Sequence, residues 1–337
     1  MEKKQKVTLL EVAELAGVSR AAAGKVLNGG SDKIGVGSEA RKRILDAARK
    51  LDYHPNMAAS ILAGGSSKLI GVFIDSVTSY RTQRRLQEIE RITSEQGYRI
   101  ITSFSHDNIA HMKEDYLMFQ RYGISDFICC SHDYPDFRKE VTELFAGARN
   151  VVFMEKPSIP GMPYVATSRV KALTAMIADA CRKGFRRLGA LHGVHISQTE
   201  RTLREEFKQA LLNNGIEPDE NLIFEYPKKD DPDFRIRQAM EKMILPYRPD
   251  FLYIDDAIYT VTLRTQLEGT GLKIMVHGGN GDPLFNHMNL SSSDPCYEKI
   301  AGALLDLLLH PEMRKTVPVV DEVYQWKTPG NQTFRLK

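Results

Sequence analysis

The sequence predicts an N-terminal all-α module followed by an α/β core of two lobes, each a doubly wound parallel sheet. Up to Gly65, apolar residues recur at helical spacing in short segments. From Leu69 onward, short apolar runs alternate with amphipathic stretches of helical length. This alternation is typical of parallel sheets that are covered by helices. The length of 337 residues independently suggests two or three domains.

The N-terminal module begins with two short predicted helices. Thr8 and Glu11 have the spacing of a capping box, which starts the first helix, and Gly17 breaks it. Ser19 can cap a second helix, which is expected to end near Asn28. The residues predicted to form the apolar face of the first helix are Leu10, Val12, Ala13, Leu15 and Ala16.

A third helix is predicted after the loop that ends at Gly37. Ser38 can cap this helix, and His54 ends it because the residue before a proline avoids helical angles. The residues expected to face inward are Ile44, Leu45, Ala48 and Leu51. The residues expected to face outward are Arg41, Lys42, Arg43, Arg49 and Lys50.

The body contains eight apolar runs of strand length. The predicted strands are 69–74, 99–104, 126–130, 150–154, 188–192, 222–226, 251–254 and 273–277. The clearest helical patterns between them are 83–98, 170–185 and 200–215. Eight strands are too many for one small sheet, so we expect two lobes with a ligand cleft at the carboxyl ends of their strands. A single barrel is the alternative, because strand number alone permits it.

Composition and charge narrow the classes of function. Apolar residues make up 42% and charged residues 26%, as in soluble globular proteins. The most apolar stretch, 300–309, is too short to span a bilayer and contains Asp306, and no secretory signal is visible. The first 65 residues hold 11 Lys and Arg against 7 Asp and Glu, whereas the remainder holds 35 against 36. A basic module on a near-neutral body indicates an anionic polymer as partner.

The chemistry-bearing residues do not form a pattern typical of an enzyme. Two histidine groups, His192-x-x-His195 and His132-Asp133, lack the further ligands of a metal site. The glycine-rich turn at 278–281 lacks a Walker lysine and is expected to be a plain turn rather than a phosphate cradle. We therefore predict no catalytic residues, no metal and no cofactor. The cysteines, expected to be thiols in a reducing cytoplasm, are Cys129, Cys130, Cys181 and Cys296.

The run at 7–28 resembles the helix-turn-helix of the lactose-repressor (LacI) family of bacterial transcription regulators. The sequences Y-H-P-N at 53–56 and L-A-G at 62–64 follow in the family's order. The body resembles the family's periplasmic-binding-protein-like core. The domains that this resemblance implies are a helix-turn-helix DNA-binding domain over 1–55, a hinge helix and linker over 56–66, and an effector-binding and dimerisation core over 67–337.

The resemblance also implies the side chains that contact DNA. In the major groove, Arg20 can bond guanine or phosphate, Ala21 can contact a thymine methyl, and Lys25 can reach guanine as a point charge. A solvated basic face is the alternative interpretation. The family's usual T-V-S is replaced here by A-A-G at 22–24, which removes two hydroxyls. The further DNA contacts implied are Thr8, Ser19 and Asn28 to phosphate, together with Asn56 and Leu62.

The segment 56–64 is too short to form a stable helix alone in water. In the resembling family it folds on DNA within the dimer and inserts a leucine into the minor groove. Leu62 occupies that position and is expected to kink the duplex, the alternative being an ordinary apolar linker residue. Closure of the core on a ligand would control DNA binding by changing the spacing of the two hinges.

The expected effector site departs from the sugar-responsive members of the family. Leu203 stands where they have an arginine, Glu206-Phe207 stands where they have a Gly-aromatic pair, and Gly279 replaces a sugar-binding aspartate. These departures argue against a typical sugar and favour another small molecule or a degenerate pocket. The candidate lining residues are Asp75, Arg204, Asp255 and Asn280.

The sequence thus predicts a DNA-binding transcription regulator, not an enzyme, in the cytoplasm of a bacterium and associated with its nucleoid. We expect a homodimeric repressor with a palindromic operator, because two-fold sites need two-fold proteins. The C-terminal segment TPGNQTFRLK lacks heptads, which favours a dimer over a tetramer. The alternative is a small-molecule (sugar) receptor without DNA activity, which would need a secretory signal in place of the basic module.

Overall fold

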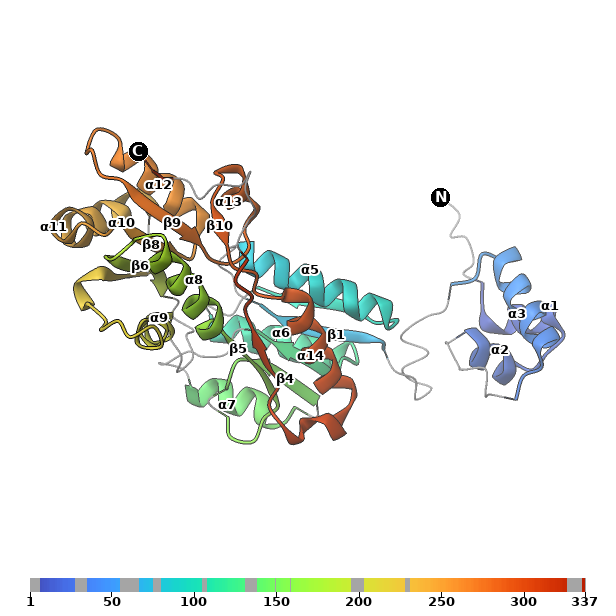
Figure 1. The fold of residues 1–337 in the computed structure, drawn as a ribbon. Coiled ribbons are helices and arrows are strands. Elements are labelled where there is room, and N and C mark those ends of the chain that lie inside the picture. The colour runs from blue at the N-terminus through green and yellow to red at the C-terminus, as the bar shows by residue number, and fades with distance from the viewer. Residues whose placement is uncertain are drawn as a thin grey trace. The chain divides into compact units, whose positions relative to one another are not determined.

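The computed structural model divides the chain into two units, which are described one at a time (Figure 1). One unit contains Met1–Leu69 with Gln120–Ile124, and the other, here called the body, contains Ile70–Phe119 and Ser125–Lys337. The residues that the structure describes are 7–27, 35–54, 67–74, 80–104, 108–130, 138–148, 150–157, 159–194, 203–227, 231–325 and 335–336.

The described part of the N-terminal unit contains three helices, and the predicted caps of the first two are confirmed. The backbone N–H of Glu11 donates to Thr8 Oγ1 at 3.3 Å, and the N–H of Thr8 donates to Glu11 Oε2 at 2.6 Å. Gly17 ends the first helix with a left-handed φ of 63°, and Ser19 Oγ accepts from the N–H of Ala22 at 3.2 Å. The helices are α1 (Leu9–Ala16), α2 (Arg20–Leu27) and α3 (Ser38–Lys50).

The core of this unit differs in part from the predicted one. Leu10 is 51% exposed, Leu15 48% and Leu45 40%, so all three inward predictions are wrong. At 100° per residue, each of them lies roughly 100° or more around its helix from the centre of the buried stripe. The inward predictions for Val12, Ala13, Ala16, Ile44 and Ala48 are confirmed. The other buried side chains of this core are Ala23, Val26 and Ala47.

The predicted start and end of α3 are also wrong in detail. Gly37 is the N-cap, and no side chain caps the helix, because Ser38 already lies in its first turn. The helix ends at Lys50, before the proline has any influence, because Asp52 adopts a left-handed φ of 52°. Arg43 is exposed as predicted, yet its Nε donates to the carbonyl of Ala16 at 3.1 Å and so satisfies the end of α1.

The first lobe of the body is an open sheet with the strand order β11-β5-β4-β3-β1-β2. Its strands are β1 (Leu69–Phe73), β2 (Arg99–Ser103), β3 (Asp126–Cys129), β4 (Asn150–Met154), β5 (Tyr164–Ser168) and β11 (Val319–Asp321). The helices between these strands are α5 (Tyr80–Glu95), α6 (Ile109–Arg121), α7 (Arg138–Ala146) and α14 (Tyr297–Leu309). Helices α5 and α14 pack together over one buried face of the sheet.

The second lobe has the order β10-β9-β8-β6-β7. Its strands are β6 (Leu188–Val194), β7 (Ile223–Pro227), β8 (Phe251–Ile254), β9 (Ile274–Gly278) and β10 (Ser291–Ser292), and β12 (Arg335–Leu336) pairs antiparallel with β9. Its helices are α8 (Val170–Arg182), α9 (Leu203–Leu212), α10 (Pro232–Ala239), α11 (Leu245–Tyr247), α12 (Ala257–Leu267) and α13 (Pro283–His287). Two open sheets confirm the predicted fold class and exclude the barrel.

Each of the eight predicted strands is present, with its ends shifted by at most two residues. The strands that the sequence analysis missed are short or poor in apolar residues. Strand β5 reads YVATS, and β11 has only three residues. Val319 pairs with Ala166 across more than 150 positions of sequence, so β11 depends on a distant partner and leaves no local signal.

The chain passes between the lobes through three described segments, here called the crossovers: 168–170, 292–297 and 321–323. Backbone hydrogen bonds tie them together. The N–H of Glu322 donates to the carbonyl of Ser168 at 2.8 Å, and Asp294 and Val323 exchange two bonds of 2.8 Å. The carboxyl ends of both sheets therefore meet beside a linked set of crossovers.

Candidate functional site

Helix α2 presents an exposed basic face. Arg20, Ala21 and Lys25 are all exposed, whereas Ala23 and Val26 are buried on the opposite face. The three predicted base-contacting residues are thus brought to one surface. Gly24 has a packing reason, because a Cβ at that position would lie 3.3 Å from Leu9 Cδ2.

The two predicted phosphate contacts at the helix starts are exposed as well. Thr8 and Ser19 cap α1 and α2, so each hydroxyl lies beside backbone N–H groups that attract an anion. Hydrogen bonds from the backbone and the hydroxyl of Thr8 lower the pKa of Glu11, which keeps the cap intact at neutral pH. The other three predicted DNA contacts, Asn28, Asn56 and Leu62, lie outside the described residues.

The predicted effector residues are only partly brought together. Asn280 donates its side-chain amide to the backbone carbonyl of Asp255, and both residues are buried at the carboxyl end of the second sheet. Asp255 Oδ1 also accepts from Tyr226 Oη at 3.3 Å. Arg204 instead pairs with Glu220 and, at 3.3 Å, with Glu225. Asp75 lies outside the described residues.

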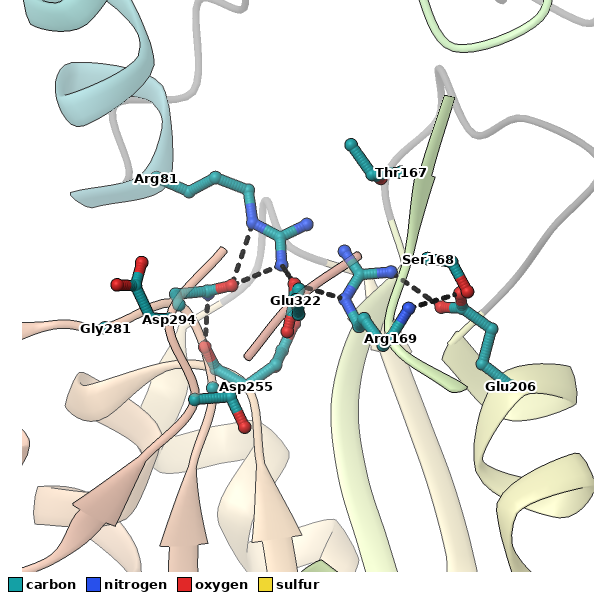
Figure 2. Close-up of polar contacts among 12 residues, drawn as sticks. Arg81, Thr167, Ser168, Arg169, Glu206, Asp255, Gly281, Asp294 and Glu322 are labelled. Atoms are coloured by element: carbon teal, nitrogen blue, oxygen red, sulfur yellow. Dashed lines mark hydrogen bonds and ion pairs between the residues drawn. The ribbon is translucent and has the colours of Figure 1, made fainter. Parts of the chain in front are cut away.

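Four charged residues that the sequence analysis did not select lie near Asp255, as Figure 2 shows; two carboxylates are buried and two guanidinium groups are 14% and 19% exposed. They are Arg81 from α5, Arg169 and Glu322 from the crossovers, and Glu206 from α9. Arg169 Nη1 lies 2.8 Å from Glu206 Oε2, and its Nε lies 3.1 Å from Glu322 Oε1. Arg81 Nη2 is 3.6 Å from the same oxygen of Glu322.

Burial and ion pairing have opposite effects on these charges. Burial raises the pKa of the Glu322 carboxyl, and the guanidinium groups of Arg169 and Arg81 oppose this rise. Burial would lower the pKa of Arg169, but the carboxylates of Glu322 and Glu206 hold it well above its ordinary value. Arg169 therefore keeps its charge, and each of the four residues has an oppositely charged group within 3.6 Å.

The four residues that the sequence analysis missed differ in how far the sequence could have revealed them. Glu206 could have been found, because it stands where the resembling family has a glycine. Arg169 follows β5, a strand that the apolar pattern did not reveal, and Glu322 follows the equally hidden β11. Arg81 looks like any other arginine of the charged sequence RTQRRLQEIER.

The enzyme-like fragments do not assemble into a site in the described part of the chain. No group of three or more metal-ligating side chains occurs there. His192 is buried, with its Nε2 3.5 Å from Glu225 Oε1, whereas His195, His132 and Asp133 lie outside the described residues. No described helix has both the length and the apolar character to cross a membrane.

Comparisons with known proteins identify a family for the N-terminal helices and relatives for a larger part of the chain. A model of the lacI family of bacterial regulatory proteins matches residues 8–56. The sucrose operon repressor of Klebsiella pneumoniae is 29% identical over 64% of this chain and 64% of that protein. The HTH-type transcriptional regulator GntR of Pseudomonas aeruginosa is 28% identical over 62% of this chain and 59% of that protein. The matches thus span less than two thirds of either relative.

Solved structures extend the likeness in fold to nearly the whole chain. The lac repressor dimer bound to operator and the anti-inducer ONPF aligns with a TM-score of 0.75 and 19% identity, over 95% of this chain and 97% of that one. The complex of the transcriptional regulator CelR with cellobiose gives a TM-score of 0.60 and 17% identity, over 94% and 98%. The capped helix-turn-helix, the two open lobes and these matches lead to one conclusion: residues 8–56 match the lacI family of bacterial regulatory proteins, and the body has the fold of the lac repressor core.

Proposed function

We propose that the protein is a sequence-specific DNA-binding transcription regulator that represses its target genes as a homodimer. The observation that supports this most directly is the exposed basic face of α2, with Arg20 and Lys25, on a helix whose opposite face is buried. A helix with this distribution can enter the major groove without losing its own packing. The names of the relatives, an operon repressor and a transcriptional regulator, agree with this role.

The proposed operator is palindromic, with one half-site for each protomer. Thr8, Ser19 and Asn28 position the module on phosphate, and Asn56 and Leu62 act where the hinge meets the minor groove. The domain plan follows: a DNA-binding domain over 1–55, a hinge helix and linker over 56–66, and a core over 67–337 that pairs the protomers. Binding to a bacterial operator places the protein in the cytoplasm, at the nucleoid.

The proposed effector is a small molecule other than a typical sugar. A Cβ on Gly279 would lie 2.5 Å from Tyr253 Oη, so the aspartate that sugar-responsive members carry there has no room. Leu203, at the expected arginine position, is buried in the second lobe's core. A receptor without DNA activity is the weaker interpretation, because it leaves the capped basic module unexplained.

Selection of bound duplexes from a randomised DNA library tests the proposal on the full chain without added ligand. We expect a palindromic consensus whose affinity falls steeply between low and moderate salt, because each phosphate contact releases counterions. The absence of any consensus, with weak binding of all sequences, would contradict sequence-specific regulation.

Replacement of Lys25 by alanine should weaken binding to the selected operator by roughly 1–3 kcal/mol, because its ammonium group reaches a base edge. Fluorescence anisotropy on the operator and on a scrambled duplex measures the difference. Lys50, an exposed lysine at the end of α3, provides the control as Lys50→Ala. An equal loss on both duplexes would mean that Lys25 contacts only phosphate.

A further inference from the structure

A contact between Arg81 and Asn280 joins the two lobes at the carboxyl ends of their sheets. Arg81 lies in the first turn of α5 in the first lobe, and Asn280 follows β9 in the second lobe. Nε of Arg81 donates to Asn280 Oδ1 at 2.8 Å, and Nη2 donates to the same oxygen. A two-point contact of this kind fixes direction as well as distance, which a single bond from lysine cannot do.

Both the side chain and the backbone of Asn280 form further hydrogen bonds. Its side-chain amide donates to the carbonyl of Asp255, and its own carbonyl accepts from Tyr297 Oη at 3.1 Å. Tyr297 begins α14 of the first lobe, so Asn280 is held by two residues of the other lobe. Its φ of 66° is left-handed, a conformation that asparagine tolerates better than most residues. Asn280 is thus oriented by the protein itself rather than left open for a ligand.

The charges around the contact are compensated internally. Arg81 is paired with Glu322, Glu322 with Arg169, and Arg169 with Glu206, as Figure 2 shows. The two guanidinium groups face two carboxylates, and all four residues are largely shielded from water. No charge from a small molecule is needed to bring the lobes together.

We propose that Arg81 and Asn280 form a clasp that holds the body closed without any small molecule, and that this closed form is the one that binds the operator. A small molecule that enters the cleft must then compete with Arg81 for Asn280, and by opening the clasp it would release DNA. The consequence for DNA rests on the proposed function, whereas the clasp itself does not.

Hydrogen–deuterium exchange of the full chain, without DNA or ligand, tests the clasp. In Arg81→Ala we expect amides in the segments 278–283 and 292–297 to exchange at least about tenfold faster, because the lobes open about the crossovers. Strand β3 lies in the interior of the first sheet and should keep its exchange rate. Arg81→Lys should exchange at an intermediate rate, since it keeps the charge but loses the two-point contact.

Arg91→Ala is the matched control on the same helix. Arg91 pairs with Glu88, Glu95 and Glu298, all within the first lobe, so its loss removes more ion pairs without touching the cleft. Unchanged exchange at 278–283 in Arg81→Ala, or equal acceleration in Arg91→Ala, would overturn the clasp.

Measurement of operator binding tests the regulatory role of the clasp independently of the clasp itself. Arg81→Ala should weaken binding to the selected operator at least about fivefold, the lower end of typical coupling between sites, while Arg91→Ala leaves it unchanged. Faster exchange with unaltered or tighter operator binding would overturn the closed form as the DNA-binding form. If the wild-type chain binds no operator, the proposed function fails, and the exchange result still decides whether the clasp exists.

Discussion

Replacement of Ile44 by alanine is expected to unfold the N-terminal unit and abolish operator binding, while the body keeps its own unfolding transition. Ile44 is fully buried and is the largest side chain in a core whose other buried members are alanines and valines. Truncation of such a residue costs about 2–5 kcal/mol. A unit of about 70–80 residues rarely has more than that to lose.

Leu45→Ala is the matched control for this effect. Leu45 is the next residue of α3 and is 40% exposed, so its truncation should change stability by no more than about 0.5 kcal/mol. Hydrogen exchange in α1 and α3 reports unfolding of the unit, and anisotropy on the operator reports binding. Equal damage from the two variants would show that the buried face of α3 is wrongly assigned.

The contrast between Ile44 and Leu45 shows where the sequence is informative about the fold. Caps are local, so the pairing of Thr8 with Glu11 and the break at Gly17 could be predicted from a few neighbouring residues. The choice between Ile44 and Leu45 depends on the angle at which three short helices cross. That angle is a property of the packed unit, and apolar periodicity over two or three turns does not determine it.

In the body, too, features that depend on neighbouring residues could be predicted, and contacts between distant segments could not. Buried strands such as β4 and β8 are continuous apolar runs, and their predicted bounds are correct. The paired charges are different, because Arg81, Arg169, Glu206 and Glu322 come from four separate segments. A charged residue in a polar stretch predicts exposure on its own. Only the meeting of both lobes at the crossovers reveals that these four form ion pairs with one another.

Replacement of Glu206 by glutamine should lower the stability of the body by about 3 kcal/mol, near the lower end of the cost of breaking a buried ion pair. Glutamine keeps the shape of the side chain but removes its charge. Arg169 then loses the carboxylate that accepts from both its guanidinium and its backbone N–H, and it retains Glu322 as a counter-charge. Urea unfolding of the body's own transition measures the loss.

A double variant separates the cost of an uncompensated charge from a loss of packing. Glu206→Leu combined with Arg169→Met removes both charges at similar volume, and well-packed apolar replacements of buried pairs are often neutral. We expect the double variant to be more stable than Glu206→Gln, although Glu322 then relies on Arg81 alone. If the double variant is the less stable of the two, the pair contributes net stability, and the cluster holds the lobes together by attraction. If it recovers, the ions serve mainly to specify how the two lobes meet, which is the property that a clasp between them requires.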